Sequence, residues 1–262
     1  MKVLEIPFSG GGLGKTRGCE KAPARIVEEL SRIFMNEHSV EPRLSFSRVG
    51  IDSGNIDAAR AAIKSSFASL GTSQRIAALG GDHAVTGPCF EAFAAAHKNA
   101  GLIVFDAHPD AMDSGFFSHE DFVRNLVEEG FLRPENLVLM GLRSMHRKEL
   151  NYLRSKKIRF FTCREIFEEG IQETTDTAMS IAKDFGSSYI SVDIDVLDPA
   201  FAPGVAYPEP GGLSTRELLY MLGRLLKVRN VGALDVTEVN PDRDIGSATV
   251  RAAAKIVAEA AD

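Results

Sequence analysis

The chain has 262 residues, of which 44% are hydrophobic and 25% are charged, the composition of an ordinary globular protein with one or two domains. Its formal net charge of −6 argues against a nucleic-acid-binding surface, which normally carries a basic stripe. No apolar run approaches the ~18 residues of a membrane-spanning helix, and the residues after Met1 show no signal-peptide pattern.

Apolar runs alternate with amphipathic stretches along the whole chain. Such alternation predicts an α/β fold, in which a mainly parallel sheet is covered by helices on both faces. We find no linker, low-complexity tract or internal repeat, so we expect residues 1–262 to form a single domain. The predicted strands span residues 3–8, 44–50, 75–79, 102–106, 137–141, 158–162, 189–193 and 231–236, and the predicted helices span residues 24–36, 55–70, 85–98, 121–129, 147–155, 175–185, 215–227 and 246–261.

The segment Ser9–Thr16 follows the first predicted strand and nearly matches the phosphate-binding pattern Gly-x4-Gly-Lys-Thr. Serine replaces the first glycine of that pattern. A true phosphate-binding loop also needs a helix that begins at its lysine, and here Gly18 and Pro23 interrupt the stretch. We therefore do not expect this loop to bind a nucleotide.

The cysteines indicate the compartment. Cys19, Cys89 and Cys163 are odd in number and form no Cys-x-x-Cys pair. Reduced thiols of this kind are typical of a cytoplasmic protein, which is the location we predict.

Histidine and carboxylate residues follow four of the predicted strands. Gly80–His83 follows the third strand, Asp106–Asp110 the fourth, Asp193–Asp195 the seventh and Glu238 the eighth. Ligands of parallel sheets bind at the carboxyl ends of strands, which is where these residues are expected. Residues two apart in an extended chain share a face, so each cluster should point toward one spot.

Buried together, these side chains need a cation, because unpaired carboxylates would repel one another and raise their own pKa values. Two imidazoles and four carboxylates with no thiolate suit Mn²⁺, although zinc, iron, cobalt and nickel stay open. Four carboxylates balance the charge of two divalent ions. The alternative for any single cluster is a helix cap with a salt-bridged loop. The expected metal ligands are His83, Asp106, His108, Asp110, Asp193 and Asp195.

Taken together, the motifs resemble the signature set of the ureohydrolases, the arginase and agmatinase superfamily of binuclear manganese enzymes that cleave guanidino compounds to urea. The resemblance covers roughly residues 75 to 242. It implies an arginase-like, three-layer α/β/α sandwich with an eight-stranded, mainly parallel sheet, and a homo-oligomer, commonly a trimer or hexamer. The matching segments are Gly80–His83, Asp106–Asp110, Ser191–Pro199 with Pro203 and Gly204, and Glu238–Pro241.

The resemblance also implies how the metals are held. His83 and Asp110 should bind one ion, and His108 and Asp195 the other. Asp106 and Asp193 should bridge the two ions, which lower the pKa of a shared water so that it acts as the nucleophile near neutral pH. The segment Ser9–Thr16 becomes a loop at the active-site rim. Asp82 and Asp198 are expected to brace loops or to hydrogen-bond the ligands.

Glu238 is expected to hold the guanidinium group of the substrate. A carboxylate matches the planar fork of a guanidinium bidentately, and the family uses the corresponding glutamate in this way. The alternative is an exposed glutamate that caps a helix.

His119 is the expected proton shuttle to the departing amine. A histidine with an ordinary pKa near ~6.5 suits proton transfer at neutral pH. The family usually has glycine after this histidine, whereas this chain has Glu120, and the alternative is a solvent-facing residue in the first turn of the next helix. His38, His97 and His146 carry no motif and are expected at surface or ordinary packing positions.

The substrate is indicated by Met112. Arginases have an asparagine here that reads the α-carboxylate, which methionine cannot do, so the chain is closer to agmatinases. The arginine-rich entry loop of agmatinases is not matched, however, and guanidinobutyrate, arginine and formiminoglutamate stay open. We therefore predict an agmatinase-like hydrolase of a small cationic guanidino compound. The alternatives are an arginase or formiminoglutamase, a non-catalytic metal-binding relative, or a two-metal phosphoesterase, which the lack of a basic cluster disfavours.

Overall fold

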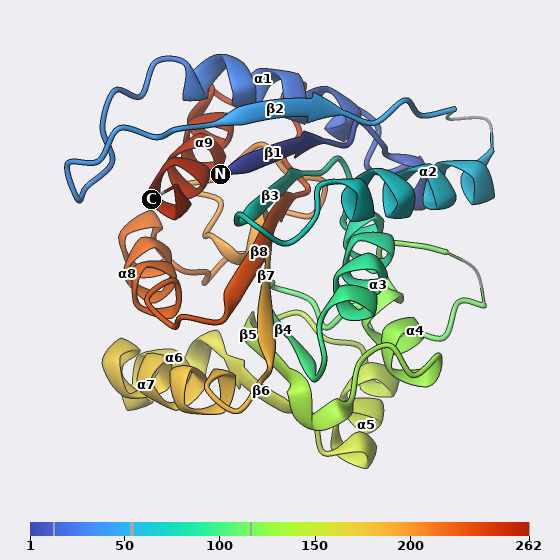
Figure 1. Cartoon of the computed structure of the whole chain (residues 1–262). Coiled ribbons are helices and arrows are strands. Elements are labelled where there is room, and N and C mark those ends of the chain that lie inside the picture. Colours follow the sequence, from blue (N-terminus) through green and yellow to red (C-terminus); the bar gives the residue numbers. More distant parts are fainter. Residues whose placement is uncertain (13, 53–54, 116, 262) are drawn as a thin grey trace.

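The computed structural model of the chain describes residues 1–12, 14–52, 55–115 and 117–261; Leu13 of the predicted rim loop and Asp262 of the predicted domain lie outside them. Within these ranges, eight parallel strands form one sheet between two layers of helices (Figure 1). The predicted three-layer fold is therefore confirmed. The strands are β1 (Lys2–Glu5), β2 (Ser45–Arg48), β3 (Ile76–Leu79), β4 (Ala100–Phe105), β5 (Leu137–Leu142), β6 (Arg159–Thr162), β7 (Ser187–Asp193) and β8 (Val231–Thr237). The helices are α1 (Ala22–Leu30), α2 (Ile56–Ser69), α3 (Thr86–Ala96), α4 (Phe122–Glu128), α5 (Arg147–Lys156), α6 (Cys163–Glu169), α7 (Ile171–Ala182), α8 (Thr215–Leu225) and α9 (Ala248–Ala260).

Two hydrophobic cores lie on opposite faces of the sheet. Leu102 and Val104 of β4 pack into the core formed with α2, α3, α4 and α5, whereas Ile103 and Phe105 pack into the core formed with α1, α6, α7, α8 and α9. Successive side chains of a strand point to opposite faces, so a strand buried on both sides reads as a continuous apolar run. Each such side chain contributes about 1.5–3 kcal/mol on full burial.

The strand order brings the sequence motifs together. It runs β2-β1-β3-β8-β7-β4-β5-β6, so the four motif-bearing strands β3, β8, β7 and β4 are neighbours in the middle of the sheet. All are parallel, and their carboxyl ends therefore meet at one edge. That edge is where an open parallel sheet binds its ligand.

Two helix predictions are wrong. The sequence predicts a helix over 24–36, but α1 ends at Leu30, and the Asn36 side chain accepts hydrogen bonds from the backbone of His38 and Val40 instead. Such local bonds compete with a helix. The sequence also misses α6, which begins with a capping box between Thr162 and Glu165. That Thr-x-x-Glu pattern is a readable helix start.

The near-match to a phosphate-binding loop does not form one. Lys15 lies in a turn, and α1 begins only at Ala22. The loop is instead tied to the sheet, because the Gly12 backbone donates a hydrogen bond of 2.9 Å to Asp82 Oδ2. A Cβ atom at Gly81 would come within 1.8 Å of the Phe8 carbonyl oxygen, so only glycine fits where the segments that follow β1 and β3 lie side by side.

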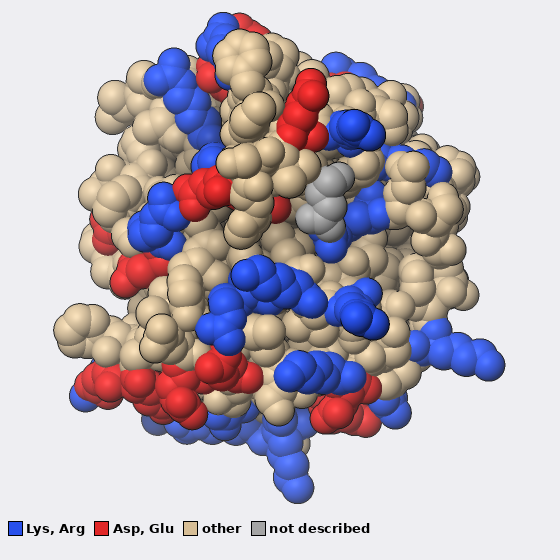
Figure 2. Space-filling view, turned by 60° about the vertical axis from the view of Figure 1, so that its left-hand side comes forward, with Lys and Arg blue, Asp and Glu red and all other residues tan. Residues whose placement is uncertain are grey.

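The surface carries charges of both signs. On the face shown in Figure 2, groups of Lys and Arg are interrupted by Asp and Glu, in keeping with the modest net charge of −6. None of the helices in the described ranges combines the length and the apolar character needed to cross a membrane.

Candidate metal centre and substrate pocket

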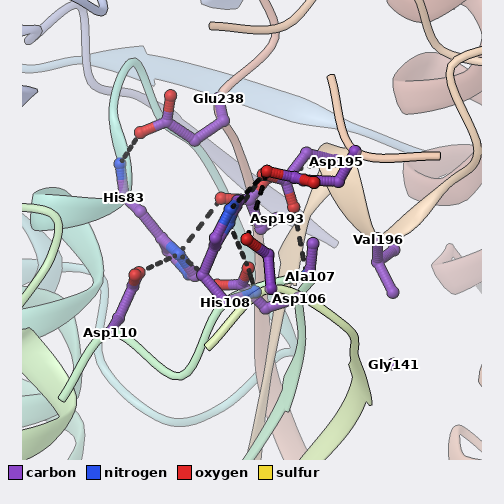
Figure 3. Close-up of polar contacts among 12 residues, drawn as sticks. His83, Asp106, Ala107, His108, Asp110, Gly141, Asp193, Asp195, Val196 and Glu238 are labelled. Carbon is purple, nitrogen blue, oxygen red and sulfur yellow. Dashed lines mark hydrogen bonds and ion pairs between the residues drawn. The ribbon is translucent and has the colours of Figure 1, made fainter. Parts of the chain in front are cut away.

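The six predicted metal ligands converge at the carboxyl edge of the sheet (Figure 3). Three strands deliver them, and short turns redirect the chain after each strand. β3 leads to His83, β4 leads to Asp106, His108 and Asp110, and β7 ends at Asp193, with Asp195 in the 3-10 turn Ile194–Val196.

His83 is the centre of the first cluster. Its Nδ1 atom lies 3.1 Å from Asp106 Oδ2, 2.9 Å from Asp110 Oδ2 and 3.3 Å from Asp193 Oδ2. Yet neither this nitrogen nor Asp106 Oδ2 has a hydrogen-bond partner of acceptable geometry among the described residues. This nitrogen and one oxygen each from Asp106 and Asp110 lie within 4.8 Å of one another, which is the arrangement a cation requires, and Asp193 Oδ2 approaches the same nitrogen.

His108 is the centre of the second cluster. Its Nδ1 atom lies 3.1 Å from Asp195 Oδ2 and 3.5 Å from Asp106 Oδ1. Asp106 therefore presents one oxygen to each histidine and belongs to both clusters. Asp193 presents Oδ2 to His83, while its Oδ1 accepts a hydrogen bond of 2.8 Å from the Asp195 backbone.

The electrostatics of the cluster fit divalent cations. Burial raises the pKa of Asp110 to about 7 and also raises those of Asp193 and Asp195, and neighbouring carboxylates add to each shift. A nearby positive charge reverses such shifts. Imidazole nitrogen and carboxylate oxygen without thiolate suit hard or borderline ions, and two divalent ions would cancel four carboxylates.

Two residues of the site have unusual backbones. Asp110 has φ 48° and Glu238 has φ 61°, in the left-handed region that non-glycine residues seldom adopt. Such strain costs on the order of 1–3 kcal/mol and concentrates at functional sites. Backbone hydrogen bonds hold both residues in place, from Val123 to Asp110 and from Glu238 to Gly81.

A buried polar network holds the Nε2 side of the His83 imidazole and so orients the ring. Its Nε2 lies 2.9 Å from Ser191 Oγ, and the Ser191 hydroxyl donates a 2.7 Å hydrogen bond to Asp235 Oδ1. Because the single hydroxyl hydrogen goes to Asp235, His83 Nε2 must be the donor to Ser191, so the neutral imidazole has its lone pair on Nδ1, toward the cluster. Thr86 and Tyr189 donate to Asp235 Oδ2.

The motifs do not identify Asp235 as part of the site, but its place in the sequence could have indicated a buried hydrogen-bonded carboxylate. An acidic residue in the middle of the apolar run 231–236 must be hydrogen-bonded once that strand is buried. Ser191 lies directly opposite Asp235 in the pairing of β7 with β8.

We expect Ser191→Ala to lower the affinity for Mn²⁺ about 10- to 100-fold, the usual effect of removing a partner that orients a ligand. The His83 imidazole would lose the acceptor that fixes its tautomer. Competition with a chelator measures the affinity. Ser188→Ala is the matched control, since Ser188 lies on the same strand but bonds Asn230 at the opposite end. An unchanged affinity in Ser191→Ala would show that the network only stabilises the fold.

A cavity of about 260 Å³ opens beside the clusters. Met112 lines the cavity, as expected for a residue that contacts the substrate. His146 also lines it; this residue follows β5 at the same edge of the sheet and caps α5, and its side chain is exposed, as the predicted surface position requires. The lining residues are His108, Asp110, Met112, His119, Glu120, Ser144, His146, Glu149, Asp193, Asp195, Tyr207 and Glu238.

Glu238 and His119 meet in this cavity and are 3% and 6% exposed, so the two solvent-exposed alternatives are excluded. Glu238 Oε1 accepts a 2.8 Å hydrogen bond from the His83 backbone and lies 3.0 Å from His119 Nδ1. Burial alone would lower the pKa of His119, but the hydrogen bond to Glu238 together with the negative charges of Glu238, Asp110 and Asp82 outweighs burial and raises the pKa to about 9. The ordinary pKa expected from the sequence is therefore wrong.

Unsatisfied polar atoms concentrate at this site. Buried polar atoms nearly always have hydrogen-bond partners, so exceptions need an explanation. Among the residues that the structure describes, such exceptions outside the site are Asp82 Oδ1 and Tyr152 OH. The remaining ones all surround the cavity or the clusters: His83 Nδ1, Asp106 Oδ2, His119 Nε2, Tyr207 OH and Glu238 Oε2. They are the atoms that a bound cation and substrate would satisfy.

Comparison with known proteins gives a consistent result. A sequence model described as the arginase family matches residues 1–261. A guanidinopropionase from Pseudomonas aeruginosa is 32% identical over an alignment that covers 98% of this chain and 84% of the relative. An agmatinase from Neisseria meningitidis serogroup C is 35% identical, and that alignment covers 72% of this chain and 60% of the agmatinase. The crystal structure of a formimidoylglutamase from Bacillus subtilis is similar with a TM-score of 0.92 and 25% identity, over 99% of this chain and 85% of that protein.

Proposed function

This chain belongs to the arginase family of hydrolases, and we propose that it cleaves a linear guanidino amine, agmatine first, to urea and an amine. The observation that carries the proposal is Glu238 Oε2, a buried carboxylate oxygen without a partner beside two candidate metal clusters. The metal ligands we propose are His83, Asp106, His108, Asp110, Asp193 and Asp195.

Two divalent ions, Mn²⁺ by the oxygen-rich donor set, fit the two clusters. His83 and Asp110 would hold one ion and His108 and Asp195 the other, while Asp106 would serve both and Asp193 would complete the set. Once bound, the ions would supply an activated nucleophile near neutral pH.

Glu238 binds the guanidinium of the substrate through Oε2. Oε1 is held by the His83 backbone and by His119, which fixes the direction of the free oxygen. A hydrogen bond between a guanidinium and a carboxylate is charge-assisted, and it is stronger in a site that excludes water. The reacting carbon is thereby held next to the clusters.

His119 delivers the proton to the departing amine. Its Nδ1 is bound by Glu238, and its Nε2 faces the cavity without a hydrogen-bond partner among the described residues. With its pKa raised to about 9, the imidazole is protonated at neutral pH and acts as a general acid. Once an oxygen nucleophile has added to the guanidinium carbon, the bond between that carbon and the nitrogen that carries the alkyl chain breaks as this nitrogen takes the proton from His119. The products are urea and the amine.

The alkyl part of the substrate contacts Met112. A flexible thioether suits a methylene chain, and it cannot donate a hydrogen bond to a carboxylate. The names of the relatives cover guanidinopropionate, agmatine and formimidoylglutamate; the absence of a carboxylate reader at Met112 favours agmatine.

The test is kcat/KM for agmatine, guanidinobutyrate and arginine with Mn²⁺-loaded protein. We expect agmatine to be the best substrate and arginine and guanidinobutyrate to be poorer, because their carboxylates would be desolvated beside Met112 without a partner. An apolar wall discriminates only modestly, about 10- to 200-fold. Urea and the amine should appear in equal amounts.

Arginine as the best substrate would contradict the role of Met112. Release of formamide from formiminoglutamate, with no urea from any guanidino compound, would indicate the formiminoglutamase alternative.

A further inference from the structure

We propose that Glu120 binds the positively charged far end of the substrate and selects guanidino amines over guanidino acids. This inference rests on the proposed function and deepens it, because it concerns a residue at which the chain departs from the pattern of its family. Glu120 lines the same cavity as Glu238, and 41% of its side chain is exposed, which places its carboxylate toward the mouth.

Glu120 and Glu238 approach His119 through different ring nitrogens. Glu238 Oε1 lies 3.0 Å from Nδ1, and Glu120 Oε1 lies 3.8 Å from Nε2. The second distance is too long for a hydrogen bond, so the carboxylate of Glu120 keeps its capacity to accept one from a ligand. A molecule with two cationic ends can therefore contact both carboxylates while its leaving nitrogen lies beside His119 Nε2.

The backbone joins Glu120 to the apolar wall. The Met112 backbone donates a 2.9 Å hydrogen bond to the Glu120 carbonyl oxygen, and the His119 backbone donates one to Gly11. Met112 and Glu120, which both line the cavity, are thus neighbours in the backbone. An apolar side chain beside a carboxylate matches a molecule in which methylene groups end in an ammonium.

Glu120 has no hydrogen-bonded cation among the described residues, and the cations near it are His119, at 3.8 Å, and Lys15. The cluster carboxylates are matched by metal ions and Glu238 by the guanidinium, while both oxygens of Glu149 accept backbone hydrogen bonds from Ala111 and His146. In the described parts of the chain, no ion pair joins Glu120 to Lys15, the nearby rim cation, whose ammonium lies 5.5 Å from the centre of the Tyr207 ring. A cationic end of the substrate can therefore make the direct hydrogen bond to Glu120 that neither His119 nor Lys15 makes.

The experiment compares agmatine with two molecules of matched length, pentylguanidine with a neutral end and 4-guanidinobutyrate with an anionic end. We expect Glu120→Gln to lower the ratio of kcat/KM for agmatine to that for pentylguanidine by about 10- to 100-fold, the effect of losing a charged hydrogen-bond partner. Glu120→Lys should shift the preference further, toward 4-guanidinobutyrate. Melting temperature and bound metal of both variants establish that the fold is intact.

Glu135→Gln is the matched control, because Glu135 is an exposed carboxylate in the 3-10 turn Pro134–Asn136 and does not line the cavity. It should leave the ratio unchanged. A ratio that Glu120→Gln also leaves unchanged, with urea still released, would overturn this inference alone. A wild-type preference for 4-guanidinobutyrate that Lys15→Gln abolishes would overturn it too, in favour of a carboxylate read by Lys15. No urea from any compound would overturn the proposed function, and this inference with it.

Discussion

Asp106→Ala should remove both metal ions and lower kcat/KM for agmatine by at least about 10³-fold, because the metal contribution of several kcal/mol is lost. Asp106 is the residue common to both clusters, with Oδ2 toward His83 and Oδ1 toward His108. Its loss also leaves the other buried carboxylates without the ions that offset their repulsion. Elemental analysis of the Mn²⁺-reconstituted variant and a urea assay measure the two effects.

Asp113→Ala is the control for this prediction. Asp113 lies in the loop that follows the fourth-strand motif, but its side chain is 69% exposed and pairs with Arg124. It should bind as much metal as the unaltered protein. If Asp106→Ala still bound two ions per chain, the shared role of Asp106 would be wrong.

His119→Asn should lower kcat by ~10²–10⁴-fold, the usual contribution of a positioned proton donor, while metal content stays the same. Asparagine can keep a hydrogen bond to Glu238 but cannot deliver a proton from the side that faces the cavity. Steady-state kinetics with agmatine, together with elemental analysis, test both parts of the expectation.

The control is His38→Asn, at an exposed histidine outside the cavity. It should retain full activity. Full activity in His119→Asn would mean that another group, or water, protonates the departing amine. A loss of metal in that variant would instead show that His119 supports the clusters rather than the proton transfer.

The candidate site can be predicted from the sequence because its residues follow strands directly. Asp106 and His108 are two residues apart after an apolar run, as are Asp193 and Asp195, and the period of an extended strand puts each pair on one face. The family resemblance then assigns roles that periodicity cannot. The convergence of the clusters follows from β3, β8, β7 and β4 being neighbours.

Other features depend on contacts between distant segments, which local patterns do not encode. The insertion of β8 between β3 and β7 pairs strands far apart in the chain. It also brings Glu238 to His119, and that contact raises a pKa that the sequence alone leaves at its ordinary value. The Ser191–Asp235 pair arises from strand register in the same way. The cytoplasmic location and a trimeric or hexameric assembly stay predictions.

The most direct test of the central claim is the rate of urea release from agmatine as a function of Mn²⁺ bound per chain. Two candidate clusters share Asp106, and the cavity beside them offers Glu238 to the guanidinium. Metal-stripped protein should be inactive, and the rate should level off as binding reaches two ions per chain. Full activity with no bound metal, or a plateau at one ion per chain, would contradict the account.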